Sequence, residues 1–265
     1  MTDSKGKAVA VTQGADGKYT FTMPASKVTV EAVFQKLASL ADPVETGVAD
    51  WLITDDHIAY LQGRYNEVTD ETLLVPTGTI TRAEVAVIFH RLLKNKNVEI
   101  TKTFSDVDDG IWYADAVRTL ASLGIINGRG LNNFDPRANI TRAEFAAIAT
   151  RFAKAAEGKI NFPDVPESFW AYRNIATAAA YGWIEGYDNG RFGPQDNITR
   201  AEAATIVNHM LLRAADRDYE RAHRDELKRF SDFQDDTVWY YYEMVEAINA
   251  HDFTRESGAE KWKVK

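Results

Sequence analysis

The pentapeptide Ile80-Thr81-Arg82-Ala83-Glu84 recurs twice in this 265-residue chain, at residues 140–144 and 198–202. The copies start 60 and 58 residues apart, and so constant a period predicts a repeat protein. The arginine of each copy holds the same place in its unit, which gives the set Arg82, Arg142 and Arg200. Equivalent arginines indicate equivalent binding sites rather than one catalytic centre.

Thr-x-x-Glu within the pentapeptide predicts the start of a helix. In such a capping box the threonine hydroxyl accepts from the glutamate amide, and the glutamate carboxylate accepts from the threonine amide. The pairs are Thr81 with Glu84, Thr141 with Glu144, and Thr199 with Glu202. Apolar residues follow at helical spacing and predict a core face on each helix: Val85, Ile88, Phe89, Leu92; Phe145, Ile148, Ala149, Phe152; Ala203, Ile206, Val207, Met210.

Capping does not explain the arginine, because a cation near the positive end of a helix dipole is mildly unfavourable. At the first helical position, the side chain lies beside N–H groups that a helix leaves free. Together they can bind a carboxylate or a phosphate. The alternative is an ion pair between units, for example with Asp106, Asp164 or Asp232. The two roles can coexist.

A second block begins with Phe-x-Asp and continues to a tryptophan that opens a helical run. Its aspartates and tryptophans are Asp106 and Trp112, Asp164 and Trp170, and Asp232 and Trp239. Gly124 and Gly182 end two of these runs and fit a left-handed helix cap, whereas the third has His251 there. The loops that follow contain Gly128 and Gly186; Gly63 is their match in the first unit, whose loop is five residues longer.

The two kinds of block alternate in a way that predicts how the chain closes. If the Phe-Asp-Trp block is half A and the glycine–pentapeptide block is half B, the chain reads B, AB, AB, A. We expect the last A half to pack on the first B half and so close a ring of three pseudo-equivalent units. An open solenoid would need polar caps at both ends, and Trp239-Tyr240-Tyr241-Tyr242 is a poor cap.

The predicted domain organisation follows from this pattern. Residues 1–36 have the alternation of strands and are interpreted as the C-terminal fragment of a small β module. Residues 37–56 are expected to be a linker. The helical units are expected at 57–101 (second half of unit 1), 102–160 (unit 2), 161–220 (unit 3) and 221–265 (the half-unit that completes unit 1).

Composition and motifs exclude several classes of function. A net charge of −8 argues against a nucleic-acid binder, and no apolar run is long enough for membrane insertion. Residues 1–18 lack the apolar segment of a signal peptide, which indicates a cytoplasmic protein or the C-terminal piece of a longer exported one. The chain has no cysteine, no metal-binding histidine spacing and no nucleophile or phosphate-loop motif. We therefore expect no enzyme, no cofactor and no metal.

The motif F-x-D-V…W-Y…G-I-I-N-G…F-x-P…I-T-R-A-E-F-A resembles the S-layer homology (SLH) domain of bacterial surface proteins. The likeness covers residues 59–253 and is strongest in the two central units. It implies a mainly α fold, a three-fold pseudo-symmetric spindle of three SLH units with a short N-terminal β segment. The stretch GKYTFTMPASKVTVEAVF (residues 17–34) also resembles the end of small β repeats on Gram-positive surface proteins.

The SLH resemblance implies non-covalent anchoring of an exported protein to the cell wall or S-layer of a Gram-positive-type bacterium. The implied partner of this monomeric module is an anionic, pyruvylated secondary cell-wall polysaccharide, bound in grooves between units. The pentapeptide arginines are the family's main contact to the sugar. The aspartates, tryptophans and loop glycines named above are further implied contacts. Core packing is an equal alternative for the tryptophans, and turn geometry is the alternative for the glycines.

Two departures and two alternatives accompany this interpretation. In the C-terminal A half, Phe233 replaces valine, the Phe–Trp spacing is one residue longer, and His251 replaces glycine, so its groove is expected to be altered or silent. The chain could instead be a helical protein-interaction scaffold for a carboxylate-bearing partner. It could also be the wall-targeting module of an enzyme encoded upstream.

Overall fold

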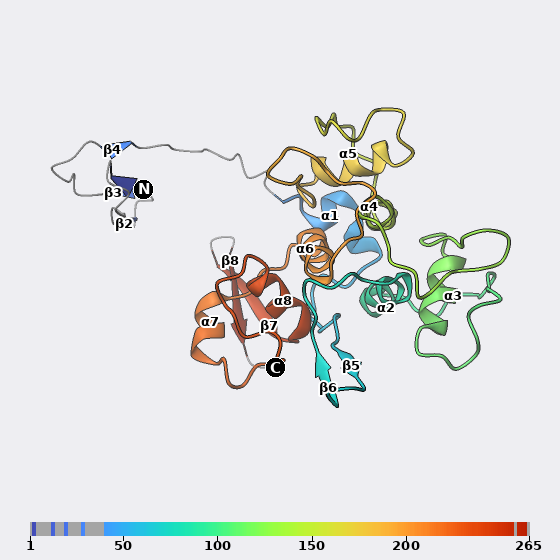
Figure 1. Ribbon diagram of the computed structural model, residues 1–265, viewed down its shortest axis with the longest axis horizontal. Coiled ribbons are helices and arrows are strands. Elements are labelled where there is room, and N and C mark those ends of the chain that lie inside the picture. Colours follow the sequence, from blue (N-terminus) through green and yellow to red (C-terminus); the bar gives the residue numbers. More distant parts are fainter. Residues whose placement is uncertain are drawn as a thin grey trace. The chain divides into compact units, whose positions relative to one another are not determined.

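The computed structural model describes residues 40–256 and 259–263, together with four two-residue strands near the N-terminus. The chain divides into two compact units, Met1–Leu37 and Ala38–Lys265 (Figure 1). In the first, β1 (Thr2–Asp3) pairs antiparallel with β4 (Val28–Thr29), and β2 (Thr12–Gln13) pairs antiparallel with β3 (Tyr19–Thr20). The other residues on which the predicted surface β module rests lie outside the described part of the chain.

The larger unit is mainly helical. Its long helices begin at the pentapeptides or just after the tryptophans, and its β structure is two hairpins. In chain order the elements are α1 (Pro43–Thr46), a 3-10 helix (Val48–Asp50), β5 (Arg64–Asn66), β6 (Glu71–Leu73), α2 (Arg82–Leu92), α3 (Ala114–Ser122), α4 (Arg142–Thr150), α5 (Tyr172–Ala180), α6 (Arg200–Leu211), α7 (Arg217–Ala222), α8 (Tyr241–Ile248), β7 (Asp252–Glu256) and β8 (Ala259–Lys263). In the described part of the chain, no helix is both long and apolar enough to cross a membrane.

The pentapeptide helices α2, α4 and α6 form the centre of the larger unit, and α3, α5 and α8 pack outside them (Figure 1). All twelve apolar residues predicted to face the core are buried. Both halves of the capping box are present at the start of α2, α4 and α6. Gly124 and Gly182 have φ values of 75° and 74°, which confirms the left-handed caps after α3 and α5.

Backbone hydrogen bonds link the three pentapeptides in a cycle. The amide of Ile80 donates to the carbonyl of Ile198, Ile140 donates to Ile80, and Ile198 donates to Ile140, at 3.0–3.2 Å. The side chains of the three isoleucines are fully buried. Each pentapeptide therefore contacts both of the others at the point where the three central helices begin.

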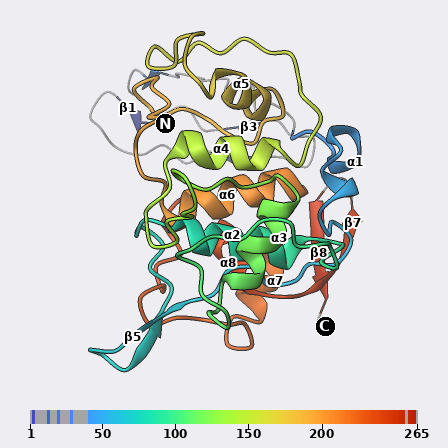
Figure 2. The same cartoon turned by 90° about the vertical axis from the view of Figure 1, so that its right-hand side faces the viewer.

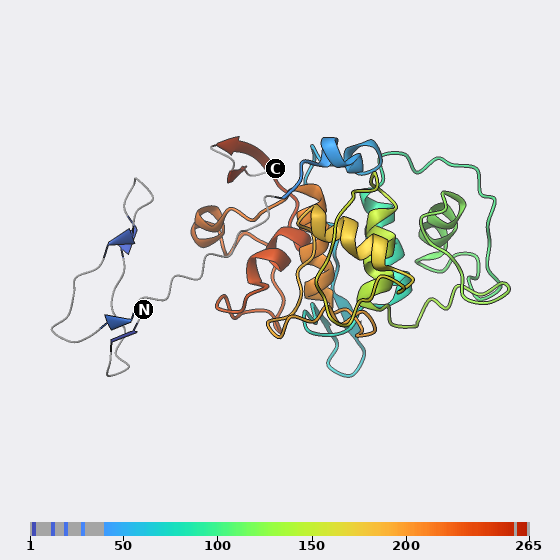
Figure 3. The ribbon, with the colours of Figure 1, turned by 90° about the horizontal axis from the view of Figure 1, so that it is seen from above.

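The C-terminal A half contacts the first B half. The Asp232 carboxylate accepts from the amides of Leu74 and Val75 at 2.8 and 2.7 Å, and the Ala247 carbonyl accepts from the amides of Tyr60 and Leu61. α1 (blue) and the β7–β8 hairpin (red) lie on the same side of the larger unit in Figure 3. Segments about 160 residues apart in sequence thus pack together.

The structure differs from the expected organisation in two segments. Residues 40–56 are not an irregular linker, because Asp42 caps α1 and the side chains of Thr46, Val48 and Leu52 are fully buried. The helical periodicity also does not continue to the C-terminus, since β7 and β8 form an antiparallel hairpin there. The longer loop of the first unit forms the β5–β6 hairpin, which projects from the larger unit (Figure 2).

Candidate functional site

The three pentapeptide arginines are buried, with 7, 6 and 1% of their surfaces exposed for Arg82, Arg142 and Arg200. Each guanidinium donates to two backbone carbonyls of the neighbouring glycine loop. The acceptors are Phe134 and Asn127 for Arg82, Phe192 and Glu185 for Arg142, and Leu74 and Gln62 for Arg200. Each arginine therefore fastens the loop of the next unit, and the third returns to the loop of the first.

The prediction that these arginines lie beside free N–H groups of the helix is wrong, because the amides of the first turn are already hydrogen-bonded. Arg82 and Ala83, the first two residues of α2, donate their amides to the carbonyls of Ala138 and Pro136, and the Glu84 amide donates to Thr81. The equivalent amides of α4 and α6 are used in the same way. Neighbouring loops, rather than an open anion site, satisfy the first turn of each helix.

The alternative, an ion pair between units, is confirmed for Arg142 and Arg200, but its partners are not Asp106, Asp164 or Asp232. Each of these carboxylates accepts two backbone amides of a loop, such as those of Phe134 and Asp135 for Asp106. Two of the three arginines pair with the glutamate of a neighbouring capping box: Arg142 with Glu202 at 2.8 Å and Arg200 with Glu84 at 3.0 Å. The aspartates hold the loops from one side while the arginines hold them from the other.

The loop glycines are required by close packing rather than by a left-handed turn. A Cβ atom on Gly128 would lie 2.5 Å from Cε1 of Phe104, and one on Gly186 would lie 2.6 Å from Cε1 of Phe162. A Cβ on Gly63 would meet Phe230 in the same way. The phenylalanine of the Phe-x-Asp motif therefore packs directly on the glycine backbone.

The three predicted tryptophans lie at the surface, not in the core. Trp112, Trp170 and Trp239 are 64, 59 and 65% exposed. Each follows an A-half loop and precedes α3, α5 or α8, while the neighbouring aromatic residues Tyr113 and Tyr241 are buried. Three equivalent indole rings thus face solvent, where a planar apolar surface can receive a ligand.

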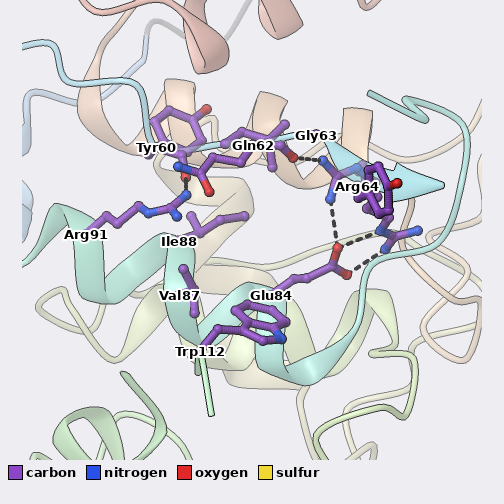
Figure 4. Close-up of a pocket in the computed structure, with 12 residues that line it drawn as sticks. Tyr60, Gln62, Gly63, Arg64, Glu84, Val87, Ile88, Arg91 and Trp112 are labelled. Carbon is purple, nitrogen blue, oxygen red and sulfur yellow. Dashed lines mark hydrogen bonds and ion pairs between the residues drawn. The ribbon is translucent and has the colours of Figure 1, made fainter. Parts of the chain in front are cut away.

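One groove brings together an arginine, a tryptophan and a loop glycine from the predicted sets, but none of the predicted aspartates lines it (Figure 4). It has a volume of about 420 Å³. Gly63 and Arg200 form part of its wall together with the exposed ring of Trp112. The remaining lining residues used below are Tyr60, Arg64, Tyr65, Glu84 and Arg91. A second depression of about 290 Å³ shares Arg64, Glu84 and Trp112 with it.

Three arginines and one carboxylate, that of Glu84, line this groove. Glu84 accepts from Arg64 through both oxygens, at 2.6 and 2.5 Å, and from Arg200 at 3.0 Å (Figure 4). Arg91 donates from Nη1 to the Tyr60 carbonyl at 3.0 Å. Burial lowers the pKa of Arg200 to about 10, which leaves it cationic at neutral pH. The groove therefore carries a positive excess inside a chain whose net charge is −8.

Sequence reasoning missed Arg64 and Arg91, although the repeat contains a signal for both. Arg64 follows Gly63 as Arg129 follows Gly128, and Arg91 lies seven residues after Glu84 as Arg151 does after Glu144. Arg129 and Arg151 also repeat the contacts, to Glu144 and to the Ile125 carbonyl. The third unit has Tyr187 and His209 instead, so no pattern common to all three units marked these positions.

Comparison with known proteins identifies the repeated segments. Residues 103–146 and 161–204 match the S-layer homology domain. Relatives include an amylopullulanase of Thermoanaerobacterium thermosulfurigenes, 39% identical over 149 residues, which are 53% of this chain and 8% of the relative. The cellulosome-anchoring protein of Acetivibrio thermocellus is 36% identical over 173 residues, which are 60% of this chain and 37% of the relative.

A third relative, the surface-layer 125 kDa protein of Lysinibacillus sphaericus, is 40% identical over 94 residues, which are 35% of this chain and 8% of the relative. The chain thus spans between 8 and 37% of the length of these relatives. By their names, these three relatives are an enzyme, an anchoring protein and a surface-layer protein. Two segments of this chain are thus similar to the S-layer homology domain.

Proposed function

We propose that this chain anchors a larger exported protein to the bacterial cell wall by binding an anionic wall polysaccharide. The observation that carries the proposal is the groove of Figure 4, which is lined by three arginines, one glutamate and an exposed tryptophan. The relatives named as anchoring and surface-layer proteins support the same location. The module acts as a monomer without a catalytic role, and its site is extracellular.

We infer that the larger unit is a closed spindle of three pseudo-equivalent SLH units. Three sets of contacts support this inference: the isoleucine cycle, the three arginine-to-loop contacts and the three aspartate-to-loop contacts. In each set, the contact from the last element returns to the first. Closure builds the groove, because Arg200 of the third unit reaches Glu84 and the Gln62 carbonyl of the first.

The chemistry of the groove suits an acidic sugar such as one with a pyruvyl carboxylate. A guanidinium binds a carboxylate bidentately, and Arg64 and Arg91 can provide this charge at the groove surface. The flat face of Trp112 suits the C–H face of a sugar ring, while Glu84 accepts hydrogen bonds from hydroxyl groups. Arg200 supports the site by holding Glu84 and the Gly63 loop in place.

Equivalent grooves are proposed at the other two unit boundaries. Arg82 donates to the Asn127 carbonyl and Arg142 to the Glu185 carbonyl, each just before a loop glycine, as Arg200 donates to the Gln62 carbonyl. Trp170 and Trp239 repeat the exposure of Trp112. In the third unit Tyr187 stacks on Arg142, whose guanidinium carbon lies 4.6 Å from the ring centroid, so that groove has an aromatic wall where the first has Arg64.

The test is co-sedimentation of the purified chain with cell-wall sacculi before and after acid extraction of their secondary polymers. We expect binding to be lost with the polymers. Binding that persists on stripped peptidoglycan would contradict the polysaccharide as partner and favour another wall component.

Variants at the groove surface separate binding from folding better than changes to the buried arginines. We expect Trp112→Ala to weaken binding about ten-fold, because it removes a stacking surface that is 64% exposed. Arg91→Gln should weaken binding more at low salt than at high salt, because salt screens the charge that it removes. Leu131→Ala is the matched control, since Leu131 is fully exposed and lies outside this groove; equal losses in the control and in Trp112→Ala would contradict the site.

A further inference from the structure

Four buried titratable side chains meet where the two ends of the larger unit join. They are His57, Glu246, His251 and Glu260, and their potential ligand atoms all lie within 4.8 Å of one another. His57 is at the start of the first unit, Glu246 is on α8, His251 follows α8, and Glu260 is on β8. A backbone hydrogen bond from the His251 amide to the His57 carbonyl, 3.0 Å long, ties these segments together.

The nitrogen and oxygen atoms of the cluster lie close to one another. Nδ1 of His57 lies 2.9 Å from Nε2 of His251, 3.2 Å from Oε1 of Glu246 and 3.5 Å from Oε2 of Glu260. Nε2 of His251 lies 3.6 Å from Oε2 of Glu246. Ligands of a tetrahedral zinc ion, each about 2.0–2.1 Å from the metal, lie roughly 3.3 Å apart. These four distances lie on either side of the tetrahedral value, and all the potential ligand atoms lie within 4.8 Å of one another.

Outer contacts hold the ligand atoms in this orientation. Nδ1 of His251 lies 3.2 Å from the Asn249 carbonyl, which makes it the donor nitrogen and directs the lone pair of Nε2 into the cluster. The Glu260 carboxylate is held at Oε1 by Arg255, at 3.2 Å, with Oε2 toward His57. The ring of His57 stacks on Phe253, and that of His251 stacks on Trp262.

The cluster places negative charge in a dry environment. Glu246 is fully buried, and within the described part of the chain its carboxylate oxygens have no hydrogen-bond partner beyond the contacts to His57 and His251. The nearest fixed cations are Arg213, which donates to the carbonyls of Ile53, Asp56 and Ile58, and Arg255. Burial and the charge of Glu260 raise the pKa of Glu246, and burial raises that of Glu260 to about 7. Two such carboxyl groups require protons or a cation.

Comparison of the three A halves shows that two residues of the cluster occur only in the C-terminal half. Glu246 and His251 lie seven and twelve residues after Trp239. At the same offsets the other two A halves have threonine and then glycine: Thr119 and Gly124, and Thr177 and Gly182. Glu246 and His251 thus replace neutral residues only in the C-terminal half, which contacts the start of the first unit.

We propose that His57, Glu246, His251 and Glu260 bind one divalent transition-metal ion, with Zn²⁺ as the best fit, in a closed structural site. Two imidazole nitrogens and two carboxylate oxygens suit zinc, whereas calcium and magnesium take mainly oxygen ligands in larger or octahedral sets. With four buried protein ligands, no position is open for a substrate. The ion would cross-link the start of the first unit, at His57, to the C-terminal half-unit.

The site is tested on the full chain after its metals are removed with a chelator and the chelator is dialysed away. We expect calorimetric titration with ZnCl₂ to show one ion per chain, and the melting temperature to rise with Zn²⁺ concentration. Co²⁺ should bind with the intense visible absorption of a tetrahedral complex. MgCl₂ and CaCl₂ serve as control salts and should produce neither effect.

Variants copied from the other repeats locate the ion. Glu246→Thr and His251→Gly should each weaken zinc binding by more than about 100-fold, while His90→Asn, outside the cluster, should leave it unchanged. Circular dichroism checks that each variant is folded, and the Co²⁺ spectrum of the unmodified chain remains decisive if one is not. Absence of stoichiometric zinc binding by the unmodified chain, or binding unchanged in Glu246→Thr, would overturn the proposal and leave a cluster neutralised by protons.

Discussion

At the scale of single residues, the pentapeptide arginine is a structural link as well as a source of charge. Arg200 donates to two carbonyls and to Glu84 while almost fully buried. A charged group taken out of water is tolerated only when it is paired and hydrogen-bonded, as it is here. Replacement of this arginine by alanine would therefore disturb the loop that forms the groove as well as any ligand contact.

Val75 adopts a backbone conformation that suits glycine, with φ at 51°. Its equivalents before the loop prolines are Asp135 and Gly193, with φ of 63° and 70°. A left-handed conformation costs a β-branched residue roughly 1–2 kcal/mol, so we expect Val75→Gly to raise the free energy of unfolding by about 1 kcal/mol. Urea denaturation measures this change.

Val68 provides the control for that substitution. It is exposed, and its φ is not positive. Val68→Gly should not stabilise the protein, because the change only adds freedom to the unfolded chain. A similar gain in both variants would show that relief of strain at residue 75 is not the cause.

A glycine at the Phe-x-Asp contact should tolerate no side chain. A Cβ on Gly128 would lie 2.5 Å from Phe104 and 2.6 Å from the Asn133 carbonyl. We expect Gly128→Ala to lower the free energy of unfolding by about 1–3 kcal/mol through overpacking. Gly110→Asn is the comparison in thermal denaturation: a Cβ there meets nothing within 4 Å, and asparagine tolerates its left-handed backbone.

At the scale of the secondary-structure element, the capping box stabilises the N-terminus of each central helix through a glutamate whose charge depends on pH. Glu144 accepts from the Thr141 amide at 2.9 Å and from Arg129 at 2.7 Å. Burial opposes ionisation of Glu144, but these hydrogen bonds outweigh it and lower its pKa. The carboxylate therefore stabilises the folded protein above the unfolded-state pKa of about 4.3.

We expect Glu144→Gln to destabilise the protein at pH 7 and to lose this effect in acid. As the pH falls below about 4.3 and through the lowered folded-state pKa, the stabilising charge of the unmodified protein disappears, so the two unfolding free energies converge. Denaturant curves between pH 7 and pH 3 measure the difference. Thr141→Ala should instead cost about 1 kcal/mol with little change over that range, because it removes a cap but no charge.

At the scale of the whole molecule, the two ends of the repeat region meet through contacts that resemble those inside it. Asp232 accepts from the amides of Leu74 and Val75 as Asp106 does from those of Phe134 and Asp135. The first pair of segments is far apart in sequence, and the second is close. If the spindle is closed in solution, the two aspartates stabilise the fold by comparable amounts.

We expect Asp232→Ala and Asp106→Ala each to lower the free energy of unfolding by about 1–3 kcal/mol, because each removes two charge-assisted hydrogen bonds. Thermal and urea unfolding of the two variants give the comparison. If Asp106→Ala lowers the free energy of unfolding and Asp232→Ala leaves it unchanged, the two ends of the repeat region do not pack together.

Local patterns predicted the central helices because the causes lie within a few residues. The three capping boxes, the twelve buried apolar positions and the left-handed glycines after α3 and α5 all depend on neighbours in sequence. The β7–β8 hairpin and the packing of residues 40–56 were not predicted. Their burial depends on surfaces contributed by distant segments, such as the Lys154 amide that binds the Thr46 carbonyl.

The sequence by itself determined the repeat, the starts of its helices and the identity of the residues that recur. Only the tertiary structure decided what those residues do. It placed the arginines on neighbouring loops and the tryptophans at the surface, and it brought Arg64, Arg91 and Arg200 into one groove. It also joined His57 to residues 246–260. Periodicity indicates which face of a segment packs on the core, whereas a site combines side chains from distant segments that only the tertiary structure brings together.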